Sequence, residues 1–158
     1  MFQHRYSPRM RLEEALKQTK PFESNYQRAL VNLIYTSNCV SAQMKLFLKD
    51  YDITTKQYNI LRILNGAQKP VSIAFIRDRL LDKVSDVSRI VDRMTNQGLV
   101  IKRPSEVDKR LVDIILSPTG KERLHTVMSS VDMIDGIMKN LSTQEVETLN
   151  RLLDKIRA

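Results

Sequence analysis

The sequence predicts a mainly helical chain with one small β-hairpin, an α+β architecture. Apolar residues recur at intervals of three and four along most of the chain, which is the period of an amphipathic helix. The pattern changes to β-branched and apolar runs over residues 99–103 and 111–116, which is typical of strands. The chain has 4 glycines and 5 prolines in 158 residues, too few for a loop-rich β fold.

We expect residues 1–21 to form a basic N-terminal extension with a short helical piece. A long amphipathic helix is expected to follow and to end near Asp50. Pro21 is placed in its first turn, where a proline loses no helical hydrogen bond. A helix of this length exceeds what a small core can cover, so we expect part of it to pack on a second subunit.

Three shorter helices are predicted in the middle of the chain. Thr54 and Gln57 have the spacing of a capping box, which satisfies early N–H groups of the helix that they open. Ser72 caps the second helix. The third helix runs over residues 85–97 and ends at Gly98, in the position where a helix terminus favours glycine. Its apolar face is formed by Val87, Ile90, Val91 and Met94.

A hairpin and two further helices complete the chain. The polar stretch 104–110 between the β-branched runs is too short to be anything but a hairpin loop. Ser117 and Pro118 give an N-cap and a first-turn proline, and the apolar stripe of the helix that they open extends to Met138. Ser142 begins a second capping box, which opens the last helix.

Two short helices, a tight turn, a glycine and a two-stranded hairpin, in this order, are typical of a winged helix-turn-helix. A helix fits the major groove of B-DNA, and a basic hairpin tip can reach the adjacent minor groove or phosphates. The N–H groups at the start of the 85–97 helix suit a phosphate. Its outer face has short hydroxyl side chains near the start and arginines further along, which suits base and phosphate contacts.

The charge favours a polyanionic partner. The formal net charge is +8 at pH 7, and residues 77–110 carry nine Lys or Arg side chains against six Asp or Glu. Residues 111–158 are nearly balanced and are not expected to face a polyanion. A solvated helix surface explains the same face, because Asp86 and Asp92 lie among its cations.

Several short motifs follow one another along the chain. They are Ile53-Thr54-x-x-Gln57-Tyr58, the run from Ser85 to Met94, Gly98-Leu99-Val100 with Arg103, Asp108-x-Arg110, and Leu116-Ser117-x-x-Gly120. In this order and spacing they resemble the multiple antibiotic resistance regulator (MarR) family over roughly residues 22–156. The family usually has Leu-Thr where this chain has Leu-Ser in the last motif.

The resemblance implies a homodimeric transcriptional regulator, usually a repressor, that binds palindromic operator DNA and often responds to a small ligand or oxidant. It implies that the 85–97 helix enters the major groove. It also implies that the 103–111 wing enters the minor groove through Arg110, whose guanidinium Asp108 holds by an ion pair. The candidate DNA-binding residues are Lys83, Ser85, Asp86, Ser88, Arg89, Arg93, Arg103, Asp108, Lys109 and Arg110.

On this interpretation one compact domain has three regions. Residues 1–21 are the basic extension, residues 22–52 and 117–158 form a helical dimerisation region, and residues 53–116 form the winged helix-turn-helix. Two recognition helices roughly 34 Å apart, one turn of DNA, read both halves of a palindrome. The expected partners are double-stranded DNA, a second copy of the chain and a small-molecule effector.

Other classes of function fit less well. The glycines form no phosphate-binding loop and no catalytic set has a local signature, so we expect no enzyme activity, cofactor or metal. Cys39 falls in the middle of the long helix, whereas sensor cysteines of the family lie near its start, so we expect it to be structural. No apolar run is long enough for a membrane span, which favours a cytoplasmic protein with no membrane partner. The alternative function is a winged-helix module that binds protein without binding DNA.

Overall fold

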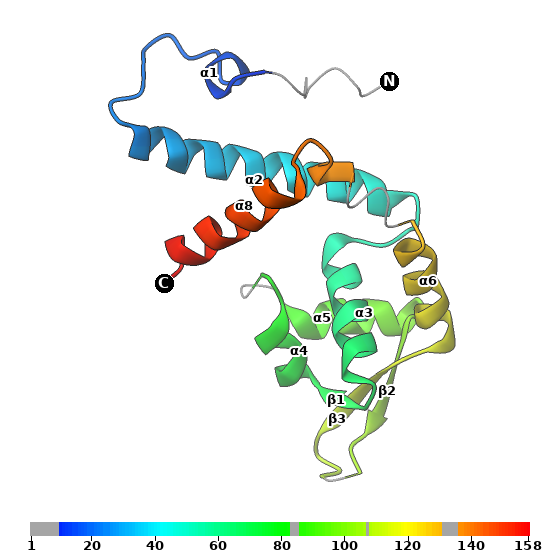
Figure 1. The fold of residues 1–158 in the computed structure, drawn as a ribbon. Helices are drawn as coiled ribbons and strands as arrows, with labels where there is room; N and C mark the ends of the chain where they lie inside the picture. The colour runs from blue at the N-terminus through cyan, green and yellow to red at the C-terminus, as the bar shows by residue number, and fades with distance from the viewer. Residues whose placement is uncertain (1–9, 83–85, 107, 131–135) are drawn as a thin grey trace. The chain divides into compact units, whose positions relative to one another are not determined.

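The computed structural model describes residues 10–82, 86–106, 108–130 and 136–158 (Figure 1). The chain divides into two compact units, Met1–Met44 and Lys45–Ala158. The candidate DNA-binding residues all belong to the second unit. Lys83 and Ser85 lie outside the described residues. In the part that is described, no helix is both long and apolar enough to cross a membrane.

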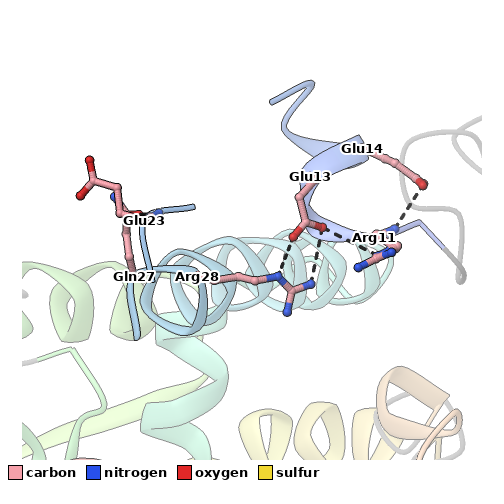
Figure 2. Close-up of polar contacts among 6 residues, drawn as sticks. All are labelled: Arg11, Glu13, Glu14, Glu23, Gln27 and Arg28. Atoms are coloured by element: carbon pink, nitrogen blue, oxygen red, sulfur yellow. Dashed lines mark hydrogen bonds and ion pairs between the residues drawn. The ribbon is translucent and has the colours of Figure 1, made fainter. Parts of the chain in front are cut away.

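The N-terminal unit contains α1 (Leu12–Ala15) and most of α2 (Asn25–Lys49). Leu12 is buried, and Arg28 of α2 binds Glu13 of α1, with Nε 2.6 Å from the carboxylate oxygen (Figure 2). The prediction that Pro21 lies in the first turn of the long helix is wrong. The side chain of Ser24 accepts a hydrogen bond from the Gln27 backbone N–H at 3.1 Å, so the chain turns into the helix only after this serine.

The second unit confirms the predicted mainly helical fold with a small sheet. Its elements are α3 (Thr55–Ala67), β1 (Val71–Ser72), α4 (Ile73–Arg79), α5 (Val87–Asn96), β2 (Val100–Pro104), β3 (Val112–Leu116), α6 (Pro118–Met128) and α8 (Thr143–Ile156). The strands form one antiparallel sheet in the order β1-β3-β2. The β2–β3 hairpin projects away from α3, α4 and α5 (Figure 1).

Most predicted helix starts are confirmed in the second unit. The side chains of Thr54, Ser72, Ser117 and Ser142 each accept a hydrogen bond from a backbone N–H in the first turn of the helix that follows. Both capping boxes are present, because Gln57 and Glu145 bond back to the N-cap backbone. These caps are local features, so the sequence spacing alone is enough to find them.

Two helices and one strand differ from the prediction. α5 spans Val87–Asn96, because Asp86 caps it and Gln97 follows as the C-cap. The helix predicted to carry its stripe to Met138 ends at Met128, where the N–H of Ser129 bonds back to His125. β1 was not expected; it forms because Val71 pairs with Ile114, a residue distant in sequence.

The core of the second unit lies between α3, α5, α6 and the sheet. Val87, Val91 and Met94 form the buried side of α5, as the sequence predicts, while Ile90 is half-buried. The largest fully buried side chains of the unit are Leu48, Ile60, Leu61, Ile76, Met94, Ile114, Leu124, Val87, Val91, Val100 and Val127. Burial of one face of α5 leaves its opposite face to solvent.

Candidate nucleic-acid interface

The outer face of α5 and the β2–β3 wing form the candidate interface. Hydrogen bonds within the second unit fix the point at which α5 ends. Gln57 is 2% exposed, and its side-chain amide donates to the Gln97 side-chain oxygen at 2.6 Å. This bond ties the first turn of α3 to the C-cap of α5. Gly98 follows with φ +71°, a left-handed conformation that favours glycine and lets the chain turn directly from α5 into β2.

The same junction is held from the other side by the start of α6. The hydroxyl of Ser117 donates to the Gly98 carbonyl at 2.6 Å and accepts from the Gly120 N–H at 2.9 Å. The backbone N–H of Ser117 donates to the Leu99 carbonyl at 3.2 Å. The Leu-Ser-x-x-Gly motif therefore joins α6 to the point where α5 becomes the wing, so these elements form one fixed body.

The outer face of α5 presents arginines to solvent. The Arg89 side chain is 86% exposed, and Arg93 is exposed one turn later. Ser88 is half-buried. Arg89 pairs with Asp86, with Nε 3.0 Å from the carboxylate oxygen. Within the described residues no ion pair or hydrogen bond involves the Arg93 side chain.

Each acidic residue on this face has a cationic partner. Asp86 pairs with Arg89, and Asp92 is hydrogen-bonded by the ammonium group of Lys102 from β2. From the sequence alone, Asp92 counts against a polyanion-binding face, and Lys102 is not among the candidate residues. A contact between a strand residue and a helix residue can be identified only from the packed structure.

The start of α5 is not the open cluster of N–H groups that the sequence predicts. Asp86 is the N-cap, and its carboxylate accepts the Arg89 backbone N–H at 3.3 Å. A carboxylate at this position interacts favourably with the helix dipole. It also occupies one of the N–H groups that a phosphate would bind, so the cationic side chains carry most of the attraction for an anion.

Arg103 lies in β2 near the loop end of the wing, opposite Asp113 of β3 in the register of the sheet. Its terminal nitrogen is 3.4 Å from the carboxylate of Glu106. Its Nε is buried and has no hydrogen-bond partner in the described residues. Arg103 is therefore more enclosed than the other candidate arginines.

The tip of the wing is a tight turn that exposes Lys109 and Arg110. The Asp108 carboxylate accepts the Arg110 backbone N–H at 2.9 Å, and the Asp108 carbonyl accepts the Leu111 N–H at 2.8 Å. The ion pair that the resemblance implies between Asp108 and Arg110 is not formed, although the structure describes both residues. Asp108 shapes the turn instead, and Arg110 is exposed.

A further exposed cation escaped the sequence analysis. Arg77 lies on α4, the helix that precedes the recognition helix, and is exposed. In helix-turn-helix proteins this helix crosses the DNA backbone, so the position of α4 could have pointed to it. No group of His, Cys, Asp and Glu suited to a metal ion occurs among the residues described.

Comparison with known proteins relates the chain to transcriptional regulators. A MarR family model matches residues 51–111, which include α5 and the whole wing tip. The HTH-type transcriptional regulator MgrA of Staphylococcus aureus is 32% identical over 108 residues, 68% of this chain and 72% of MgrA. The HTH-type transcriptional repressor IacR of Pseudomonas putida is 29% identical over 145 residues, 91% of this chain and 81% of IacR.

A solved structure resembles most of this chain in fold. It is a cysteine-to-serine mutant of MarR from E. coli complexed with operator DNA, which matches with a TM-score of 0.75 and 26% identity. The match covers 86% of this chain and 99% of that one.

Proposed function

The chain belongs to the MarR family of transcriptional regulators, and from this premise we propose that it is a homodimeric repressor of palindromic operator DNA. The proposal rests on how α5 and the wing are joined. The exposed arginines of α5 and the exposed tip residues Lys109 and Arg110 belong to one fixed body, linked through Gly98. Such a body can place a helix in the major groove and a basic tip in the next minor groove together.

The candidate DNA-binding residues fall into groups according to the part of the DNA that each is proposed to contact. We assign Arg89 and Ser88 to the major groove, Arg93 to phosphate, and Arg110 to the minor groove, with Lys109 beside it. Phosphate contacts fix the register of the protein, and base-edge contacts specify the sequence. Lys83 and Ser85 precede α5 in the sequence and remain proposed contacts.

Uncovered apolar faces support the homodimer. α8 has no buried residue, although Leu152 and Ile156 repeat at helical spacing, and both are exposed. On α2, Tyr26, Leu30 and Ile34 form another exposed apolar stripe. Large exposed apolar surfaces mark interaction sites. A second copy that covers these faces pairs two recognition helices, as a palindrome requires.

A small-molecule effector has a place to bind in the second unit. An open surface depression of about 240 Å³ is lined by Asn59, Arg62, Ile63, Arg79 and Leu81, of which the two arginines and Leu81 are exposed. The Arg79 guanidinium lies 3.5 Å from the centre of the Phe75 ring, which orients it. Two arginines with apolar neighbours suit a small organic acid, so we propose that such a ligand modulates operator binding.

The name of a similar protein supports the repressor part of the proposal. IacR is named a repressor.

The test begins with the purified chain and a library of random-sequence duplexes. Selection should enrich one palindromic sequence, and sedimentation should give a free protein of twice 18.3 kDa. The logarithm of the association constant should fall linearly with the logarithm of the salt concentration, by about 0.9 per phosphate neutralised. A library that yields no preferred duplex, with binding to duplex DNA absent at low salt, would favour the protein-interaction alternative.

A further inference from the structure

We propose that Asp86 is a positioning residue, which holds Arg89 so that its guanidinium reads a base edge and thereby sets sequence discrimination. This inference rests on the proposed DNA-binding function. It differs from the sequence interpretation, in which Asp86 is itself a candidate for contact with DNA.

The two residues are joined at two points. One carboxylate oxygen of Asp86 accepts the Arg89 backbone N–H at 3.3 Å, and the other lies 3.0 Å from Arg89 Nε. The first contact is the N-cap of α5, which fixes the aspartate on a rigid element. The second contact therefore restrains the long arginine side chain from a fixed anchor.

The pair leaves the reading end of Arg89 open. Recognition of guanine uses two guanidinium N–H groups at once. The ion pair is made at Nε, and the terminal nitrogens donate no hydrogen bond to any described residue. The side chain is 86% exposed, so these nitrogens face solvent. Restraint before binding lowers the conformational entropy that is lost on contact and favours one geometry.

Arg93 provides an internal comparison. It lies one turn further along the same face and is exposed, but its side chain has no partner among the described residues. An unrestrained cation suits a phosphate, which is a sequence-independent partner. A carboxylate on a DNA-facing helix repels every phosphate, so Asp86 weakens binding to all DNA unless positioning compensates at the correct sequence.

Substitution of Asp86 by asparagine separates these effects, because asparagine is as good an N-cap but carries no charge. Binding is measured by fluorescence anisotropy with the selected duplex and with a scrambled duplex of the same composition. For Asp86→Asn we expect tighter binding to the scrambled duplex and a discrimination ratio about tenfold lower. For Arg93→Ala we expect weaker binding to both duplexes and an unchanged ratio.

A double-variant cycle completes the test. In an Arg89→Ala background, Asp86→Asn should leave the discrimination ratio unchanged, because the residue that Asp86 holds is gone. Circular dichroism of Asp86→Asn should match the parent and show that α5 is intact. If Asp86→Asn raises affinity for both duplexes equally, the positioning role is excluded while the DNA-binding function stands. A parent protein that binds neither duplex overturns both.

Discussion

Gly120 lies so close to Leu99 that a Cβ atom on Gly120 would be 2.0 Å from the Leu99 carbonyl oxygen. This is well inside contact distance, and the atom that it would meet belongs to the backbone. The start of α6 can therefore pack against the start of β2 only if residue 120 has no side chain. This junction sets the direction in which the wing leaves α5.

Gly120→Ala should destabilise the chain by about 1–3 kcal/mol, because overpacking forces the backbone to shift. Urea unfolding followed by circular dichroism measures the change. The matched control is Gly66→Ala, since Gly66 lies in α3 with nothing within 4 Å of the added Cβ. We expect it to be neutral or to stabilise by up to about 1 kcal/mol. Equal effects of the two substitutions would show that the close approach is not real.

Ser117→Ala should cost more than Ser142→Ala, although both residues are N-caps. The Ser117 hydroxyl also donates to Gly98, and the residue is buried. Ser142→Ala loses an exposed cap, about 1 kcal/mol. Ser117→Ala loses the bond to the Gly98 carbonyl as well and leaves the buried Gly120 N–H without its partner, which brings the loss to about 2–3 kcal/mol. The same unfolding measurement distinguishes them, and equal losses would mean that the Gly98 bond contributes nothing.

Glu13 should titrate far below its usual range. The hydrogen bond from Arg28 lowers the pKa of Glu13 from 4.5 to about 2, and the Glu13 backbone N–H adds to this effect (Figure 2). A lowered pKa in the folded state means that the contact stabilises the attachment of α1 above pH 4.5. That stabilisation is lost as the pH falls from 4.5 towards 2.

Carbon NMR of the Glu13 carboxyl measures its titration midpoint, which we expect near 2. In the variant Arg28→Gln the midpoint should move up towards 4.5, because the strongest cause of the shift is removed. A midpoint near 4.5 in the parent chain would contradict the ion pair between α1 and α2.

Arg110→Ala should weaken binding to the selected duplex by roughly 1–3 kcal/mol if the wing tip enters a groove. Lys155→Ala is a charge-matched control, because Lys155 is an exposed cation on α8, outside the candidate interface. We expect it to change the affinity much less. Fluorescence anisotropy at one fixed salt concentration measures both variants. An Arg110→Ala variant that binds as tightly as the Lys155→Ala variant would remove the wing from the interface.

The sequence predicts features that arise from short spacings. The caps at Thr54, Ser117 and Ser142 depend on residues within three positions, and the left-handed turn at Gly98 depends on one residue. Pro21 shows the limit of this approach, because Ser24 offers a better cap and the helix begins after it. A local signal is reliable only when no stronger one lies nearby.

Features that depend on distant partners could not be predicted in this way. β1 exists only because Val71 pairs with Ile114, and Lys102 meets Asp92 only when β2 lies beside α5. The pair of Asp86 and Arg89 is different, since a spacing of three on a helix is a known signal for ion pairs. Both residues are predicted DNA contacts in the sequence, and the structure shows them bound to each other.

Joint contact of α5 and the wing with one duplex is the central requirement for the proposed DNA binding. The most direct test is sedimentation and anisotropy of the selected palindrome with the parent chain and with a variant that carries Arg89→Ala and Arg110→Ala. We predict two parent chains on each duplex and binding by the double variant that is weaker by roughly a hundredfold. Equal affinity of parent and variant for this duplex would contradict the account.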